Sequence, residues 1–112
     1  MSGVTLSRRL TLERPERVSD GAGGYAETWS ALGTLWGDVQ AKPGRMANGE
    51  TGMVSVTGYR ITLRAAPVGH SNRPQPGQRL RGQGRVFAIN AVSEDAARPQ
   101  YLICICEEEV TP

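Results

Sequence analysis

The sequence predicts an all-β fold: a small antiparallel β-barrel or sandwich of about six to seven strands with a long central loop. Fourteen glycines and seven prolines among 112 residues supply many turns. Between them lie short runs in which Val, Ile, Leu and Thr alternate with polar residues, as in strands. Because closing a sheet removes its exposed edges, strands joined by short turns favour a barrel or sandwich. A chain of this length suits one core, so we expect residues 1–112 to form a single domain.

The first two strands are expected to form a hairpin. Arg8–Arg14 alternates between apolar and polar residues, and Pro15 marks either an edge position or the end of the strand. Ser19–Gly24 contains Asp-Gly and Gly-Gly pairs, which provide the positive φ angles that tight hairpins need. Tyr25–Trp29 then returns as the partner strand.

Two further strands flank the long central loop. Gly33 is expected to cause a break or a bulge, after which Leu35–Lys42 forms the third strand. Thr57–Arg64 alternates cleanly and forms the fourth. Pro43–Val56 between them is about twice as long as a hairpin connection needs, and such loops are usually either functional or disordered.

The C-terminal half continues the strand pattern. Ala65–Gly77 is a turn-rich connector, and Gln78–Arg81 is a short strand. A tight turn at Gly82–Gly84 leads into Arg85–Val92, which is apolar enough to be well buried. Gln100–Glu107 is apolar on both faces, which predicts a central strand that is covered on two sides.

Composition and charge exclude several classes of function. The formal net charge of +2 gives no reason to expect general nucleic-acid binding by a free monomer. No run approaches the roughly 18–20 apolar residues that span a bilayer. The N-terminal residues also lack the apolar stretch of a secretory signal. We therefore expect no membrane association, and a protein that stays in the compartment where it is made.

The chemistry-bearing residues do not predict an enzyme. His70 is the single histidine and lies among loop residues, where a histidine is more often solvated than catalytic. The Gly82-Gln83-Gly84 motif is not followed by a helix that could hold a phosphate. Cys104 and Cys106 would point to the same face of a strand, which suits neither a mutual disulfide nor a metal knuckle. We expect reduced, packing cysteines, no metal site and no cofactor.

The arginines and tryptophans are the candidate interface residues. Arg60 and Arg64 share one strand face, and Arg79 and Arg81 share another. Each pair is compatible with a solvated face, with a surface for another protein's carboxylates, or with a DNA-facing surface in a ring. Trp36 is expected in the core, whereas Trp29 could lie in the core or at a subunit contact. The possible interface set is therefore Trp29, Arg60, Arg64, Arg79 and Arg81.

The order of these segments resembles that of the phage head–tail joining proteins, also called head-closure or stopper proteins. The resemblance runs from Arg9 to Glu108, and the order, spacing and total length are more specific than any one motif. One departure is Ala65-Ala66-Pro67, where related chains often carry polar or aromatic residues. The segments that carry the resemblance are the hairpin Leu10–Trp29, Leu35–Pro43, Gly49-Glu50, Tyr59–Arg64, Gly84–Val92 and Tyr101–Glu107.

The resemblance implies a structural virion protein in the neck of the particle. Such a protein forms a ring between the portal or adaptor and the tail, closes the DNA channel after packaging, and docks the tail. The implied partners are other copies of the chain (a ring of six, or alternatively twelve), a portal-side adaptor, a tail terminator and the packaged double-stranded DNA. The implied location is the neck of a virion or of a phage-like gene transfer agent, assembled in the bacterial cytoplasm.

Carried onto this chain, the resemblance makes the loop Pro43–Val56 the element that closes the channel. Its glycines give hinge freedom, and its methionines could meet their symmetry copies in a constriction. A disordered surface loop is the alternative interpretation. Two other functions stay open: a tail-terminator or tail-tube-like ring component, and a small-barrel nucleic-acid-binding module. The candidate gating residues are Lys42, Arg45, Met46, Asn48, Gly49, Glu50 and Met53.

Overall fold

The computed structural model describes residues 3–42, 45–49, 52–56 and 58–109. In these ranges it contains strands and no helix, so the all-β prediction is confirmed. Eight strands replace the six or seven expected. In chain order they are β1 (Arg8–Ser19), β2 (Tyr25–Ala41), β3 (Arg45–Gly49), β4 (Gly52–Val56), β5 (Gly58–Arg64), β6 (Arg79–Gly82), β7 (Arg85–Glu94) and β8 (Tyr101–Glu109).

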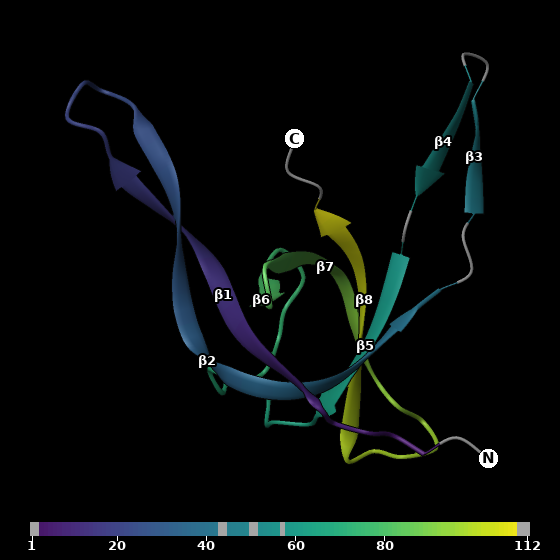
Figure 1. The fold of residues 1–112 in the computed structure, drawn as a ribbon. Helices are drawn as coiled ribbons and strands as arrows, with labels where there is room; N and C mark the ends of the chain where they lie inside the picture. Colours follow the sequence, from purple (N-terminus) through teal and green to yellow (C-terminus); the bar gives the residue numbers. More distant parts are fainter. Residues whose placement is uncertain (1–2, 43–44, 50–51, 57, 110–112) are drawn as a thin grey trace.

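Six of the strands close into a barrel, and the other two form a separate sheet. The barrel order is β1-β2-β5-β8-β7-β6, and every neighbouring pair is antiparallel. β3 pairs only with β4 and stands away from the barrel in Figure 1. The expected small antiparallel barrel is therefore present, with a hairpin added between β2 and β5.

Alternation along the barrel strands fills the interior with apolar side chains. Tyr59 meets the buried Phe87 edge-to-face, with ring centroids 5.1 Å apart, in the geometry that aromatic pairs favour. Gly37 is also buried, and a Cβ placed there would lie 2.9 Å from Cδ2 of Leu63 and 3.0 Å from Cδ1 of Leu10. The buried core comprises Leu10, Leu12, Ile61, Leu63, Leu80, Phe87, Ile89, Leu102, Cys104 and Cys106.

The strands expected at Tyr25–Trp29 and Leu35–Lys42 are one continuous strand, β2. Gly33 does not break it. The register with β1 passes from Leu12↔Gly33 to Glu13↔Ala31, so Leu32 is the extra residue of a β-bulge. The bulge alternative for Gly33 is thus correct, and the break is wrong. A bulge bends a strand without ending its ladder, which lets β2 run from the barrel into a projecting hairpin.

The far halves of β1 and β2 leave the barrel as a two-stranded ribbon. β6 pairs with β1 only from Thr11 to Glu13, and β5 pairs with β2 only from Gly37 to Ala41. Beyond these pairings residues 14–30 form a projection, called the arm below, which Figure 1 shows at upper left. Pro15 lies within the arm opposite Trp29, so its edge-position prediction is confirmed.

The turn at the tip of the arm is held by one carboxylate. Oδ1 of Asp20 accepts hydrogen bonds from the backbone N–H groups of Ala22 (2.8 Å) and Gly24 (3.1 Å). Gly21 and Gly23 adopt positive φ angles of 80° and 86°, which side chains other than hydrogen disfavour. The predicted glycine turn is therefore confirmed, and the backbone bonds hold the pKa of the Asp20 carboxyl below its usual value.

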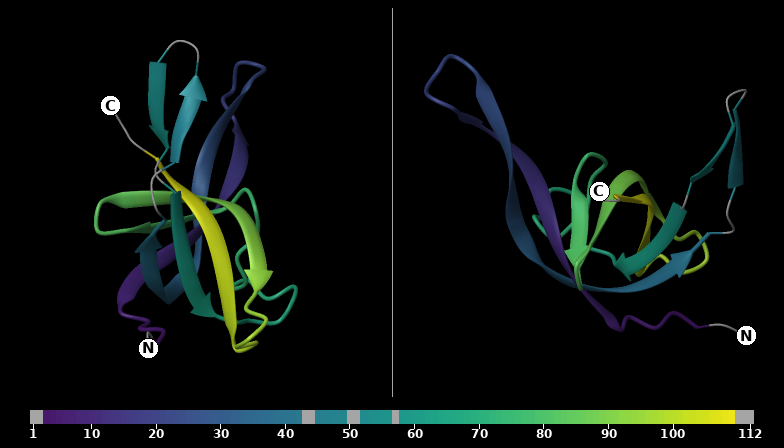
Figure 2. Two further views of the ribbon diagram at one scale, coloured as in Figure 1. Left: turned by 90° about the vertical axis from the view of Figure 1, so that its right-hand side faces the viewer. Right: turned by 45° about the horizontal axis from the view of Figure 1, so that its top comes forward.

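The region expected to be a long loop, Pro43–Val56, contains the hairpin β3–β4. Its register runs from Arg45↔Val56 to Gly49↔Gly52. Glycines and polar residues suggested a loop, but residues 53–56 read Met-Val-Ser-Val, which suits a strand. This hairpin and the arm extend from the same side of the barrel in all three views (Figures 1 and 2).

Two burial predictions are corrected by the period of the strands. Trp36 is 52% exposed instead of buried, because its neighbours Leu35 and Gly37 point inward and a strand alternates sides. β8 is central, being paired with both β5 and β7. However, only one of its faces is buried: Leu102, Cys104 and Cys106 point inward, while its outward apolar side chains are half-exposed.

The cysteines match their prediction, because both are free and buried. Burial raises the pKa of the Cys106 thiol to about 12, and raises that of Cys104 still further, with a smaller contribution from the neighbouring Cys106. Both thiols are therefore protonated at neutral pH, and the thiolate is the reactive form.

We expect neither cysteine of the folded protein to react with a disulfide reagent at pH 8. Both should react once guanidinium unfolds the barrel, because unfolding removes the burial that suppresses the thiolate. A spectrophotometric thiol assay with and without denaturant measures this. Rapid labelling of the native protein would contradict the buried placement.

Candidate functional site

A buried carboxylate organises the base of the arm. Glu13 on β1 is only 5% exposed, and it accepts hydrogen bonds from Nε of Arg79 (2.7 Å) and Nε of Arg81 (2.9 Å) on β6. The guanidinium of Arg79 also lies over the ring of Trp29 on β2, 4.1 Å from its centroid, at cation–π distance. This cluster ties β1, β2 and β6 together where the arm leaves the barrel.

The ionisation of Glu13 depends on the two arginines. Burial alone would raise the pKa of this carboxyl. The hydrogen bonds and positive charges of Arg79 and Arg81 outweigh burial, so the pKa lies below its usual value. Glu13 is charged at neutral pH, as a buried carboxylate between two guanidinium groups should be.

Three candidate interface residues therefore have partners within the chain. Trp29, Arg79 and Arg81 belong to the Glu13 cluster, and of the two arginines Arg81 keeps the larger exposure, 52% of its side chain. Their expected contact with another molecule stays a prediction. Sequence reasoning missed Glu13 because alternation along β1 makes it outward-facing, and its burial comes from Arg79 and Arg81, which lie beside it on β6.

A second arginine cluster closes the other side of the barrel. Arg85 donates two hydrogen bonds to Glu108, from Nε (2.9 Å) and Nη2 (3.0 Å), and its guanidinium lies 5.2 Å from the ring centroid of Tyr59 and 4.9 Å from that of Phe87. The hydrogen bonds between them raise the pKa of Arg85 and lower that of Glu108. The cluster joins β7 to the end of β8, and both Glu108 oxygens already accept a hydrogen bond from Arg85.

The remaining candidate arginines are exposed and have no acidic partner in the described residues. Arg60 and Arg64 both lie on the outer face of β5, with Arg64 opposite Tyr101 of β8. Arg9, exposed on β1, lies opposite the exposed Trp36. Among the described residues no ion pair is formed by any of these three arginines. The outer face of β1, β2 and β5 thus carries unneutralised positive charge.

The candidate gating residues gather on and beside the hairpin β3–β4. Lys42 is exposed just after β2, and its backbone N–H donates to the Gly58 carbonyl (2.9 Å), which joins the end of β2 to the start of β5 at the hairpin base. Glu50 lies outside the described residues. The other candidates are backbone members of the hairpin: Arg45, Met46, Asn48 and Gly49 on β3, and Met53 on β4.

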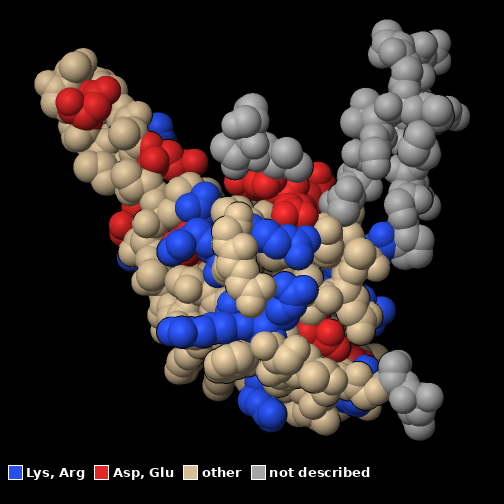
Figure 3. Space-filling model, viewed as in Figure 1, with Lys and Arg blue, Asp and Glu red and all other residues tan. Residues whose placement is uncertain are grey.

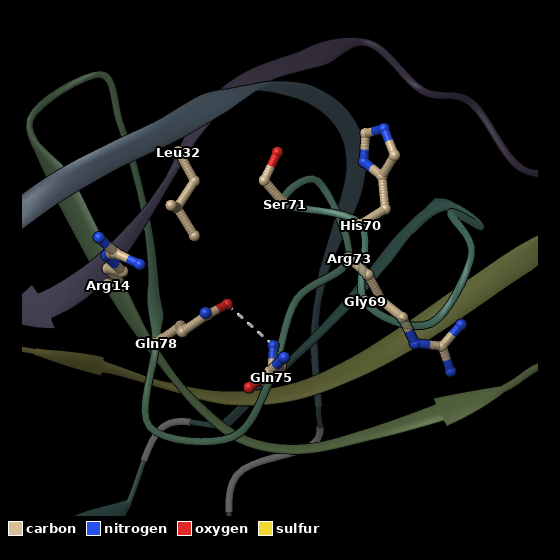
Figure 4. Close-up of a pocket in the computed structure, with 8 residues that line it drawn as sticks. All are labelled: Arg14, Leu32, Gly69, His70, Ser71, Arg73, Gln75 and Gln78. Atoms are coloured by element: carbon tan, nitrogen blue, oxygen red, sulfur yellow. Dashed lines mark hydrogen bonds between the residues drawn. The ribbon is translucent and has the colours of Figure 1, made fainter.

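A pocket of about 340 Å³ lies between the base of the arm and the connector that follows β5. Its polar side chains are used within the connector, as Figure 4 shows for Gln78, whose Oε1 accepts from the Gln75 backbone N–H. Nδ1 of His70 accepts from the Asn72 backbone (3.0 Å), and Arg73 donates to the Ala66 carbonyl. The lining is Arg14, Leu32, Gly69, His70, Ser71, Arg73, Gln75 and Gln78. Of the hydrogen bonds among the described residues, none joins the Ser71 hydroxyl to His70, whose Nδ1 already accepts from Asn72.

Two kinds of feature are absent from the described ranges. No group of three or more His, Cys, Asp or Glu side chains is placed to hold a metal ion there. No helix in those ranges is long and apolar enough to cross a membrane.

The family model described as phage head completion protein matches residues 1–109. The chain belongs to the phage head completion protein family. The resemblance to head-closure proteins noted from the sequence is thus confirmed at the level of the family.

Two solved structures resemble this head completion protein over nearly its full length. One is a chain of the "virion of native gene transfer agent (GTA) particle", with 41% sequence identity, a TM-score of 0.75 and 98% of each chain covered. The other is the solution structure of protein SF1141 from Shigella flexneri 2a, with 25% identity, a TM-score of 0.65 and 96% of each chain covered. The comparison with curated proteins found no match.

Family membership assigns a class of function to the head completion protein. It is a structural component of a phage or phage-like particle, which completes the head. This role agrees with a fold whose clusters of charge join barrel strands and the base of the arm, and it gives no reason to expect catalysis.

Proposed function

We propose that the protein forms a ring in the neck of a phage-like particle, between the portal or adaptor and the tail. The hairpin β3–β4 closes the DNA channel after packaging, and the ring provides the surface on which the tail docks. Its partners are other copies of the chain, with six preferred to match a sixfold tail, a portal-side adaptor and a tail terminator.

The observation that carries this proposal is the separation between the barrel and the hairpin. The barrel is closed by its own six strands, so its fold does not need β3 or β4. The hairpin pairs only with itself and projects from the barrel beside β2 and β5 (Figure 2). A projection that adds nothing to the core of one copy gains a use when several copies place it around a common axis.

The likeness to a chain of a gene transfer agent virion supports the same location. At 41% identity over 98% of both chains, with a TM-score of 0.75, the two proteins share a fold over nearly their full length. The identity is high enough for the neck of such a particle to be the first place to look for this protein.

We expect deletion of residues 48–52 to leave the barrel folded and to abolish DNA retention. The deletion removes the tip of β3–β4 but no barrel strand, so the thermal midpoint of the purified chain should change by no more than about 3 °C. Particles that contain the deleted chain should lose packaged DNA, which a nuclease-protection assay on purified particles measures.

The control is Val68→Ser, a change at a connector residue that is 84% exposed and lies in neither projection. Its particles should protect their DNA like those of the wild type. Equal nuclease protection of the particles with and without the β3–β4 tip would contradict channel closure by the hairpin.

A further inference from the structure

The arm carries exposed apolar and acidic groups that its own barrel does not cover. Tyr25 is 65% exposed and Val18 49% exposed, and the pairs Ser19↔Tyr25 and Val18↔Ala26 place them on opposite faces of the arm. On the face of Tyr25, the Arg17 guanidinium lies 5.0 Å from the centroid of the tyrosine ring. Glu27 and Asp20, also on the arm, form no ion pair in the described residues. A two-stranded ribbon is at best marginally stable in water without a surface to pack against.

The two free edges of the arm differ in a way that favours contact on the β2 side. The outer edge of β1 in the arm is guarded by Pro15, by the Arg14–Glu16 ion pair and by Arg17, and proline and charge blunt a strand edge. From residue 25 to residue 36, the outer edge of β2 holds a single charged residue, Glu27, and no proline. Natural sheets protect an edge of this length or cover it with another element.

The barrel offers a complementary surface, which we call the Trp36 row and define as Arg9, Trp36 and Arg64. Arg9 and Trp36 are opposite each other across β1 and β2. Gly37 pairs with Leu63 in the antiparallel ladder of β2 and β5. Arg64, the residue after Leu63, therefore lies next to Trp36, the residue before Gly37, on the outer face. The tryptophan is 52% exposed, and exposed Trp flanked by Arg is the composition of protein–protein hot spots.

Charge distinguishes the two surfaces. The arm, residues 14–30, has two arginines and three acidic residues, so it carries −1 within a chain whose net charge is +2; the remainder carries +3. Figure 3 shows acidic side chains along the arm and basic ones banded across the barrel below it. Asp38 is the acidic neighbour of the Trp36 row, and it is occupied by hydrogen bonds from the Thr5 backbone and Gln40.

We propose that the arm of one copy docks on the Trp36 row of the next copy. Tyr25 covers the indole of Trp36, and Glu27, which lies on the same face of the arm as Tyr25, faces Arg9 and Arg64. The two surfaces lie on different parts of the chain, so the contact is heterologous and can be repeated around a closed ring. The inference rests on the proposed ring and names the surfaces that build it.

A charge exchange tests the contact on the full-length chain. In sedimentation velocity, Glu27→Arg and Arg64→Glu should each raise the concentration for half-assembly by about tenfold, about the effect of one charge pair. The double variant Glu27→Arg/Arg64→Glu should return to within about threefold of the wild type. Glu109→Arg makes the same charge change on an exposed residue at the end of β8 and should assemble like the wild type.

Cross-linking in particles tests the same contact when assembly needs the other neck proteins. A variant with Glu27→Cys and Arg64→Cys, treated with a short bismaleimide, should give a ladder of multimers that extends past the dimer, because each copy contacts two neighbours. The buried native cysteines do not react. A product that stops at the dimer, or that joins the chain to a different protein, would overturn the proposal.

The two proposals fail separately. If the wild-type chain forms rings while Glu27→Arg and Arg64→Glu assemble normally, arm docking is wrong and the ring stands. If native mass spectrometry of neck complexes released from particles finds a single copy of the chain, the ring itself is wrong.

Discussion

Replacement of Glu13 by glutamine is expected to destabilise the protein by about 2–3 kcal/mol, a large share of a typical domain's stability. The amide can accept through one oxygen only, so its NH₂ group faces a guanidinium N–H where the carboxylate accepted a hydrogen bond at 2.7 or 2.9 Å. Arg79, whose side chain is only 19% exposed, also loses the charge that compensates its burial. Urea unfolding at pH 7 measures the change.

The same variant should change how stability depends on pH. The folded-state pKa of Glu13 is lowered, so its contribution to stability is fully present above the unfolded-state pKa of about 4.3. That contribution is lost as the pH falls through the folded-state value. The free-energy difference between the wild type and Glu13→Gln should therefore shrink in acid.

Glu16→Gln is the matched control on the same strand. Glu16 forms a single ion pair at 3.4 Å with Arg14, and both side chains are more than 40% exposed. Such surface pairs contribute about 0–1 kcal/mol, so this variant should unfold close to the wild type. Equal losses in Glu13→Gln and Glu16→Gln would mean that the Glu13 cluster adds no special stability.

Replacement of Gly37 by valine is expected to cost about 3 kcal/mol or more and to shift the thermal midpoint accordingly. Even the first added carbon would lie 2.9 Å from Leu63 and 3.0 Å from Leu10 inside the closed barrel. The gain in strand propensity from glycine to valine is about 1 kcal/mol, which does not offset overpacking from three sides. Differential scanning calorimetry measures the shift.

Gly58→Val is the control for strand propensity without a clash. A Cβ at Gly58 would meet its nearest neighbours, the Lys42 side chain and the Cys106 carbonyl, at 3.7 and 3.8 Å, which is ordinary contact. This variant should unfold near the wild type. A Gly37→Val protein that is as stable as Gly58→Val would show that the barrel interior has unused room at Gly37.

The strands that alternate with period two were predictable because one face had to enter the core. Leu10, Ile61 and Leu63 were placed correctly on this ground alone, and so were the turns in which glycine takes a positive φ angle. The same rule, applied strictly, also places Trp36 outside. Its size suggested burial, but side-chain direction in a strand follows position, and Leu35 and Gly37 already occupy the inward sites.

The site was less predictable, because its contacts join residues far apart in the chain. Glu13 meets Arg79 and Arg81 across 66 and 68 residues, and no local pattern connects them. The hairpin β3–β4 was missed for the opposite reason: its glycines and polar residues are typical of a loop, and only the pairing of Arg45–Gly49 with Gly52–Val56 distinguishes it from one. What the sequence did indicate was an insertion longer than a turn.

The continuity of β2 makes the two projections mechanically dependent. One strand of 17 residues begins in the arm, forms a wall of the barrel and ends at Ala41, beside the base of β3–β4. An extended strand transmits tension without stretching, since its backbone is already near full length. In the proposed ring, a force that a neighbouring copy applies to the arm is therefore transmitted along β2 to the hairpin β3–β4. The bulge at Leu32 is the position at which β2 would bend under that force.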